Sequence, residues 1–340
     1  MMFKKIISII LVVAAAMLVS CNSKHNQPVQ KNETVAVKDT EIKCKPVETS
    51  EPDKEAETVP EGEERNTIIA EELFSSEPPV YIESTSMLMI NADTGEHIYE
   101  KDAHKELAPA SMTKVMTTIV ALECIEDMNS EFTFTDEHIS YLRSLSSSVA
   151  GFSAGETVSA KDLIYATMLP SGGDGAIGVA ILAAGSVESF VDLMNKKVEE
   201  LGLEHTHFAN PTGLDELNHY SSAYDMCQIM NYAVKNEAFI EIITTRDYTT
   251  APTPYHPNGI KLRNLIQEGV TNNSISAPYL IGGKPGFTDA AKLCLVTYAE
   301  HNDTHYILAT LGAGNGEKYP QYHFTDMDAI YTAYFSQENN

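Results

Sequence analysis

The chain has 340 residues, enough for one large domain or two modest ones, and 43% of them are apolar, as in a globular protein with a real core. Its formal net charge at pH 7 is −25, which argues against a nucleic acid partner, because the phosphate backbone would repel so acidic a protein. The part after residue 77 carries 14 basic and 34 acidic side chains, so an anionic substrate needs a local cation to attract it.

The first 21 residues have the pattern of an export signal. A basic start, MMFKK, precedes an apolar run that is too short to span a bilayer comfortably. The run ends in Leu18-Val19-Ser20-Cys21, which resembles a bacterial lipobox. We therefore expect residues 1–21 to be a lipoprotein signal peptide and Cys21 to carry the lipid. The alternative is an ordinary secretory signal that happens to contain a Cys.

Residues 22–78 are predicted to be an acidic disordered linker. Eleven acidic and only two basic residues lie between Glu48 and Glu77, and large apolar residues are few. Such a segment cannot bury enough surface to offset its ordering entropy, and its charges repel one another. The folded domain is expected to cover residues 79–340.

The five cysteines show no metal-binding or redox spacing. Cys124, Cys227 and Cys294 lie in apolar segments, which predicts that they are buried as small hydrophobic residues. Cys44 falls in the predicted linker. The sequence therefore indicates no disulfide framework, no metal site and no cofactor.

The domain begins with a predicted hairpin over 87–101, which turns at Asp93-Thr94-Gly95. Apolar residues at helical spacing predict helices after Ser111 and over 159–169, 186–203 and 221–235, with Ser159 and Asp162 as a capping pair. Strands are predicted over 278–289, 291–302 and 305–314, and a helix over 325–337. The expected fold class is mixed α/β: an antiparallel sheet made of the terminal strands, with a helical insert.

Ser111 and Lys114 place a hydroxyl and an amine on one face at the start of a predicted helix. A serine needs a base to act as a nucleophile, and a lysine can serve if burial lowers its pKa. The helix start also offers free N–H groups to developing negative charge. An S-x-x-K pattern alone is common, so this hypothesis depends on further sites.

Two such sites follow in the chain. Ser171 lies in the glycine-rich loop LPSGGDGA, and Lys284 lies on a predicted strand in IGGKPGFTD. Glycines beside them allow a backbone to approach a ligand closely. The order S-x-x-K, Ser loop, K-x-G resembles the motif set of penicillin-binding proteins and serine β-lactamases.

Longer segments narrow this resemblance. They are APASMTKVMTTIVALE, SSSVAGFSAGETVSAKDLIYATMLPSG, VDLMNKKVEELGLEHTHFANPTGL, HYSSAYDM and GGKPGFTDAAKLCLV. These segments resemble the D-alanyl-D-alanine carboxypeptidase family, the low-molecular-mass penicillin-binding proteins, over roughly residues 80–335. The resemblance implies the penicillin-binding-protein/β-lactamase-like transpeptidase fold.

The resemblance also implies roles for single residues. Ser111 would attack the carbonyl of the penultimate D-Ala, Lys114 would take its proton, and Ser171 would help pass that proton to the leaving D-Ala. Lys284 would attract the terminal carboxylate, and the N–H groups of Ser111 and Phe287 would form the oxyanion hole. The substrate-binding residues are expected to be Lys284, Gly286, Phe287, Thr288 and Gly173.

Two positions depart from the family pattern. The second motif is usually Ser-x-Asn, but Gly173 stands in place of the Asn, and the third is usually Lys-Thr-Gly, but Pro285 stands in place of the Thr. Both changes should weaken substrate positioning. A catalytically impaired penicillin-binding protein therefore stays open as an alternative, as does a serine β-lactamase that would use Glu199, Glu200 or Glu204.

The expected function is a serine carboxypeptidase that removes the terminal D-Ala from peptidoglycan stem pentapeptides and is acylated by β-lactams. The chain ends soon after the catalytic domain, so the N-terminal lipid is expected to hold it outside the cytoplasmic membrane. Asp174 is expected to cap a helix rather than to act in catalysis. Residues 146–148 could form either a substrate-cleft edge or a plain turn.

Overall fold

A computed structural model of the chain describes residues 44–45, 76–145, 147–314 and 321–338, which belong to one compact unit, Ile42–Asn340. The second unit, Met1–Glu41, lies outside the described residues, and so do the predicted signal peptide with Cys21 and most of the predicted linker.

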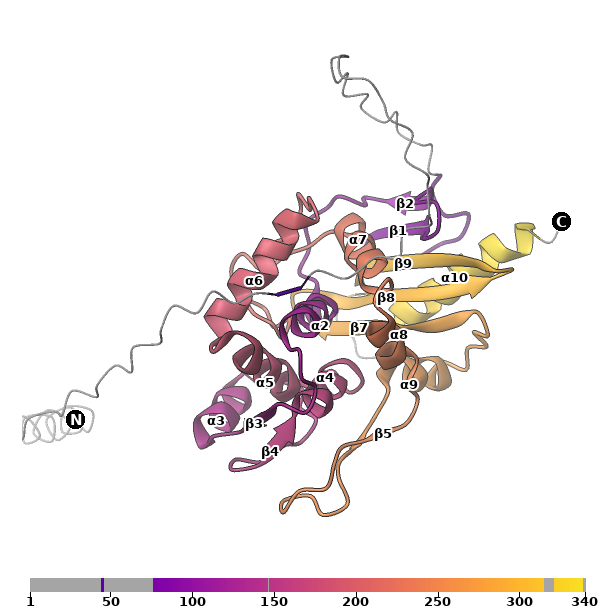
Figure 1. The fold of residues 1–340 in the computed structure, drawn as a ribbon. Helices are drawn as coiled ribbons and strands as arrows, with labels where there is room; N and C mark the ends of the chain where they lie inside the picture. The colour runs from indigo at the N-terminus through magenta and orange to yellow at the C-terminus, as the bar shows by residue number, and fades with distance from the viewer. Residues whose placement is uncertain (1–43, 46–75, 146, 315–320, 339–340) are drawn as a thin grey trace, which may run out of the picture. The chain divides into compact units, whose positions relative to one another are not determined.

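The domain is built on a five-stranded sheet with the order β2-β1-β9-β8-β7 (Figure 1). Every neighbouring pair is antiparallel. The first strand of the described part pairs with the last, which confirms the predicted sheet of terminal strands. The strands are β1 (Ser86–Asn91), β2 (His97–Lys101), β7 (Leu280–Thr288), β8 (Lys292–His301) and β9 (Thr304–Ala313).

Between β2 and β7 the chain forms a helical insert, as predicted. Its helices are α2 (Thr113–Cys124), α3 (Asp136–Ser144), α4 (Ala160–Met168), α5 (Gly173–Ala184), α6 (Val187–Glu200), α7 (Ala223–Ala233), α8 (Glu237–Thr244) and α9 (Leu265–Asn272). Two small two-stranded sheets lie among them, β3 (Glu131–Thr133) with β4 (Thr157–Ser159) and β5 (Tyr248–Thr249) with β6 (Lys261–Leu262). The helix α10 (Tyr322–Glu338) follows the sheet.

The two faces of the sheet belong to two separate cores. Leu88 and Ile90 of β1 join the larger core, which contains the helical insert, whereas Met87 and Met89 join a smaller core with α10. Side chains alternate between faces along a strand, so a strand buried on both faces is apolar throughout. This explains the unbroken apolar run MLMI in β1.

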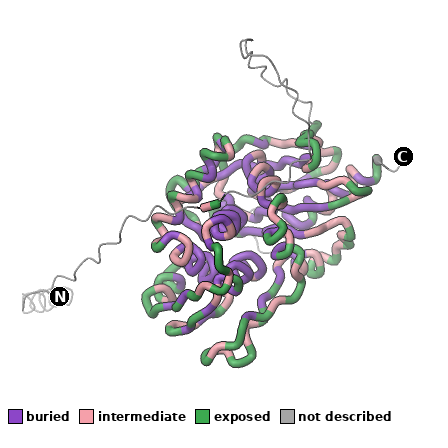
Figure 2. Tube along the Cα trace, viewed as in Figure 1, coloured by how far each residue is buried: buried purple, intermediate pink, exposed green. Residues whose placement is uncertain are grey.

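Helix α2 is buried around almost its whole circumference, between the sheet and the helices of the insert (Figures 1 and 2). It packs against α4, α5, α6, α7 and α8. Its side chains therefore lie in a low-dielectric environment, including the polar ones at its start.

The helix signals were partly correct. Ser159 caps α4, since its Oγ accepts a hydrogen bond from the N–H of Asp162 at 3.1 Å. The carboxylate of Asp162 does not return to Ser159 but accepts from Tyr248 Oη and from the N–H of Ala251, so the expected reciprocal pair is only half formed. The helices α3, α8 and α9 were not predicted, and the helix expected after the Ser171 loop, α5, was given no bounds. Helix α5 has the sequence GDGAIGVAILAA, which is apolar almost throughout and so shows no amphipathic period.

The prediction for two cysteines was wrong. Cys44 and Cys124 form a disulfide across 80 positions of sequence, at the C-terminal end of α2. Lys45 continues this attachment through its N–H, which donates to Glu123 O at 2.9 Å. No spacing rule could pair these two residues, because their proximity depends on how the chain returns to α2. Cys227 and Cys294 are buried free thiols, as predicted.

Among the described residues, no single helix is long and apolar enough to cross a membrane. Helices α5 and α6 meet that requirement only as a pair, and they are bent by 85° relative to each other.

Candidate active site

Ser111 and Lys114 meet at the start of the buried helix. Ser111 lies in a short 3₁₀ turn, Ala110–Met112, that leads directly into α2. The Nζ of Lys114 lies 3.0 Å from Ser111 Oγ and also donates a hydrogen bond to the carbonyl of Thr212. The predicted spacing argument is therefore confirmed in its geometry: the amine reaches the hydroxyl.

Burial sets the state of this amine. Lys114 is 1% exposed, and desolvation lowers its pKa to about 7, while the charge of Asp174 opposes that shift. Near neutral pH a large share of Lys114 is therefore the free amine, which can accept a proton from Ser111. No ion pair neutralises it among the residues that the structure describes.

The third motif lies directly against the nucleophile. A Cβ placed on Gly286 would be 2.8 Å from Ser111 N and 2.9 Å from the Cβ of Ala110, so only glycine allows this approach. Strand β7, which carries Gly286, is an edge strand of the sheet. An edge strand can tolerate Pro285, because half of its positions direct their N–H away from the one neighbouring strand, where a missing N–H breaks no ladder bond.

Lys284 lies beside Lys114 but is more deeply buried than a carboxylate-binding cation would suggest. It is 0% exposed, and its Nζ donates to the carbonyl of Pro285 at 3.0 Å. Burial, together with the charge of Lys114, lowers the pKa of Lys284 well below its usual value. Its role towards a terminal carboxylate stays a prediction.

The end of β7 opens to solvent. Phe287 is 43% exposed, and its N–H is the second expected oxyanion donor. The hydroxyl of Thr288 donates to Asp215, whose other carboxylate oxygen accepts from the N–H of Ala290 at 3.3 Å. Thr288 is thus hydrogen-bonded within the protein, to a residue that the sequence analysis did not single out.

Ser171 has a strained backbone and an unpaired hydroxyl. Its φ is 62°, in the left-handed region that serine rarely adopts. Its Oγ is buried and has no hydrogen-bond partner among the described residues. It precedes α5, which packs against α2. A buried hydroxyl without a partner is available to a ligand.

The expectation that Asp174 caps a helix was wrong: the N-cap of α5 is Gly172, no side chain caps it, and Asp174 lies in the first turn. Its carboxylate instead holds a loop, since besides the N–H of its neighbour Gly175 at 2.9 Å it accepts from Ala150 at 2.8 Å, Gly151 at 2.9 Å and Phe152 at 3.3 Å. The loop that contains residues 150–152 is thereby held against the second motif. Ser148 strengthens the contact, since its Oγ donates to Ser171 O at 2.7 Å.

The space of the missing Asn at position 173 is occupied. A Cβ on Gly173 would lie 2.1 Å from Ser147 Oγ and 3.2 Å from Ser148 O. The loop before the second motif therefore occupies the volume that a side chain at 173 needs. The sequence showed that Gly173 stands in place of the family's Asn, but not that Ser147 and Ser148 occupy the space beside it.

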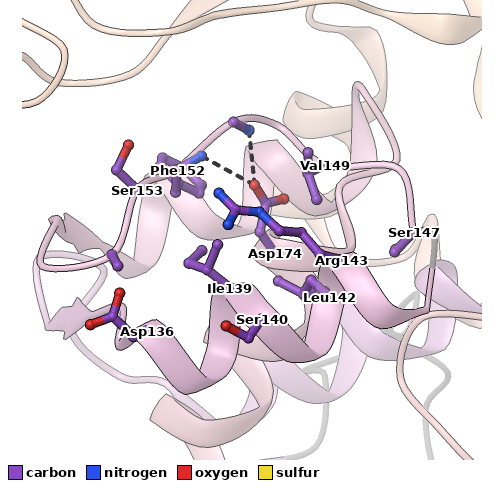
Figure 3. Close-up of a pocket in the computed structure, with 12 residues that line it drawn as sticks. Asp136, Ile139, Ser140, Leu142, Arg143, Ser147, Val149, Phe152, Ser153 and Asp174 are labelled. Atoms are coloured by element: carbon purple, nitrogen blue, oxygen red, sulfur yellow. Dashed lines mark hydrogen bonds between the residues drawn. The ribbon is translucent and has the colours of Figure 1, made fainter.

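A cavity of about 390 Å³ adjoins the same loop (Figure 3). Ser147 and Asp174 line it together with residues of α3, and the guanidinium of Arg143 extends over it. None of the proposed catalytic residues lines this cavity, so it does not decide between the two readings left open for residues 146–148. Ser146 lies outside the described residues.

The loop from Asn210 to Leu214 completes the site and was missed as a functional element. Asn210 Oδ1 accepts hydrogen bonds from the N–H of Thr212 and Gly213, which folds the loop into a tight turn. A Cβ on Gly213 would lie 1.9 Å from Ala110 O, and the φ of Gly213 is +81°. The Asn-Pro-Thr-Gly run is the signal that could have indicated this turn.

A helix-tip serine, a buried lysine at hydrogen-bond distance and a glycine-bearing edge strand define the S-x-x-K class of serine peptidases. The chain belongs to the D-alanyl-D-alanine carboxypeptidase family, since the sequence model of that family matches residues 72–315.

Curated relatives agree with this assignment. The D-alanyl-D-alanine carboxypeptidase DacF of Bacillus subtilis is 35% identical over 235 residues, which cover 68% of this chain and 58% of the relative. The D-alanyl-D-alanine carboxypeptidase of Streptomyces sp. K15 is 32% identical over 215 residues, 61% of this chain and 73% of the relative. This chain thus matches little more than half of the Bacillus protein's length.

Solved structures share the fold. The crystal structure of the Streptomyces K15 DD-transpeptidase has a TM-score of 0.69 at 27% identity, and the match covers 77% of this chain and 99% of that one. A D-alanyl-D-alanine carboxypeptidase from Mycobacterium tuberculosis has a TM-score of 0.67 at 26% identity, over 77% and 94% of the two chains. These matches confirm the fold that the resemblance implied.

We expect Gly213→Ala to damage the site and Gly185→Ala to serve as its control. Both glycines have φ of +81°, but a Cβ at 185 meets nothing within 4 Å. Gly185→Ala should cost about 1–2 kcal/mol from backbone strain alone. Gly213→Ala should cost about 1–3 kcal/mol more from overpacking and should slow acylation of Ser111 at least about tenfold. Urea denaturation and the rate of labelling by a fluorescent penicillin measure the two effects, and equal results for both variants would contradict the close contact.

Proposed function

We propose that the protein is a serine D-alanyl-D-alanine carboxypeptidase that acts on peptidoglycan stem peptides. The observation that carries this proposal is the pair of Ser111 Oγ and Lys114 Nζ, 3.0 Å apart, with burial lowering the pKa of the amine to about 7. A hydroxyl next to an unprotonated base is an activated nucleophile.

Acylation proceeds in two steps. Ser111 Oγ forms a bond to the carbonyl carbon of the penultimate D-Ala while Lys114 takes the hydroxyl proton, and the N–H groups of Ser111 and Phe287 stabilise the oxyanion. The carbon–nitrogen bond then breaks. Ser171, whose hydroxyl has no partner among the described residues, gives its proton to the departing D-Ala nitrogen and takes the proton that Lys114 removed from Ser111, which restores the amine and leaves an ester on Ser111.

Water then hydrolyses the ester. Lys114, again an amine, takes a proton from the attacking water, and the bond between the acyl carbon and Ser111 Oγ breaks. Ser111 regains its proton, and the shortened stem peptide leaves as a carboxylate. The same acylation by a β-lactam gives a stable adduct on Ser111, so β-lactams are the expected covalent inhibitors.

A slow or purely penicillin-binding protein is the second candidate function. The occupied space at Gly173 and the complete burial of Lys284 favour it, because both reduce contacts that would orient a peptide. A β-lactamase is less favoured. Glu200, one of the carboxylates that could activate its water, is engaged by Lys197 at 2.6 Å on α6.

The test of the proposal combines two measurements on one protein. Intact-mass analysis should show a single penicillin adduct on the wild-type protein and none on Ser111→Ala. Release of D-Ala from a stem pentapeptide should fall at least about 10³-fold in the same variant. An adduct without any D-Ala release by the wild type would support the second candidate. An adduct that persists in Ser111→Ala would exclude this nucleophile.

The pH dependence of acylation should report Lys114. Because only the amine form accepts a proton and its pKa is about 7, the acylation rate should rise about tenfold per pH unit below 7 and level off above it. The charge of Asp174 raises that pKa, so Asp174→Asn should shift the rising limb to lower pH. Asp303→Asn, in an exposed turn, is the control and should not change the pH at which the acylation rate rises. If the acylation rate of the wild type rises only above pH 9, Lys114 behaves as an ordinary, solvated lysine and the proposal is wrong.

We also propose that the protein is exported and anchored to the outer face of the membrane through a lipid on Cys21. The lipobox-like run before Cys21 supports this proposal. The disulfide between Cys44 and Cys124 supports export independently, because disulfides form and persist in oxidising compartments. Outside the membrane the enzyme would meet its cell-wall substrate.

Cell fractionation tests the anchor. Wild-type protein should sediment with membranes and incorporate a labelled fatty acid, whereas Cys21→Ala should do neither. Non-reducing gels should show Cys44 and Cys124 bonded in the wild type in cells. Membrane-bound Cys21→Ala without incorporated fatty acid would argue for another means of attachment.

A further inference from the structure

His219 lies behind the nucleophile, outside the three motifs. It belongs to the loop before α7, is 6% exposed, and packs its ring against Phe208. Its Nε2 lies 2.8 Å from Thr113 Oγ1, and its Nδ1 lies 3.0 Å from the N–H of Ala209. Thr113 is the first residue of α2, two positions after Ser111.

These partners define which ring nitrogen carries the proton. A backbone N–H can only donate, so Nδ1 must accept from Ala209 and the neutral ring must carry its hydrogen on Nε2. That hydrogen points to Thr113 Oγ1. Burial lowers the pKa of His219 to about 4, so the ring is neutral in the range where Lys114 acts as a base.

The threonine then has one hydrogen to give, and its acceptor is Ala110. Thr113 Oγ1 lies 2.8 Å from Ala110 O, which completes a directed chain from His219 through Thr113 to the peptide between Ala110 and Ser111. All three groups are buried, where such hydrogen bonds reinforce one another.

That peptide needs to be held. The φ of Ala110 is 47°, a left-handed conformation that costs an alanine about 1–2 kcal/mol. A peptide unit is planar and trans, so fixing the carbonyl oxygen on one edge fixes the N–H of Ser111 on the opposite edge. Gly213 packs against the carbonyl edge and Gly286 against the N–H edge.

We propose that His219 is a positioning residue that acts through Thr113 to aim the N–H of Ser111 into the oxyanion hole. The inference rests on the proposed function, in which this N–H stabilises the oxyanion. His219 touches neither substrate nor reacting atoms in this role. Its contribution is to keep a strained peptide in the one orientation that presents the donor.

The test uses matched substitutions in the full-length protein. Thr113→Val keeps the shape of the side chain but removes the relay hydroxyl, whereas Thr113→Ser keeps the hydroxyl. His219→Leu removes the donor, and His219→Gln places an amide N–H near the position of Nε2. The readouts are the second-order rate of Ser111 acylation by penicillin, and kcat and KM for D-Ala release, with urea denaturation as the check on folding.

We expect Thr113→Val and His219→Leu to slow acylation about 10–100-fold, somewhat less than removal of an oxyanion donor. The loss should fall on kcat with KM nearly unchanged, because the donor acts in the transition state. Thr113→Ser should recover most of the acylation rate lost in Thr113→Val, and His219→Gln most of that lost in His219→Leu. Within each pair, the two variants should have the same free energy of unfolding. Wild-type acylation by folded Thr113→Val, or equal losses in Val and Ser, would overturn the proposal.

The two proposals fail in different ways. If the wild type is acylated at Ser111 but releases no D-Ala, the carboxypeptidase function fails, while the acylation rates of the four variants still decide the role of His219. If the wild type releases D-Ala and the variants match it, only the positioning role fails. A wild type that forms no adduct at all overturns both.

Discussion

The site depends on one amine that the fold removes from water. Lys114 projects from a helix that is buried between the sheet and the insert, so its charged form loses hydration that the interior does not replace with an ion pair among the described residues. Its two acceptors are a carbonyl and the nucleophile itself. The desolvation that makes the lysine a base is therefore the same burial that builds the core around α2.

A second buried lysine lies close enough to feel the charge of Lys114. Lys284 is fully buried, and burial together with the charge of Lys114 lowers the pKa of Lys284 well below its usual value. Asp174 acts in the opposite direction on Lys114 and at the same time holds the loop that borders the second motif. Desolvation, opposed only in part by the charge of Asp174, therefore places the pKa of Lys114 at about 7.

Backbone strain and glycine contacts surround the reacting groups. Ala110 and Ser171 both adopt positive φ, and Gly213 and Gly286 allow two backbones to touch the Ala110–Ser111 peptide. Such conformations persist only where surrounding contacts hold them. The structure also accommodates the two departures from the family pattern. Ser147 occupies the space beside Gly173, and Pro285 lies on an edge strand.

The sequence by itself determined the sheet of terminal strands, the helical insert and the S-x-x-K face, because strand alternation, helical period and i,i+3 spacing are local properties. It gave no bounds for α5, whose apolar sequence carries no period, and it left Cys44 unpaired. Only the tertiary structure decided the pKa of Lys114, the Cys44–Cys124 bond and the contact of His219 with Thr113. Each of these depends on burial or on residues far apart in the chain, and no local pattern specifies which distant segments will surround a side chain.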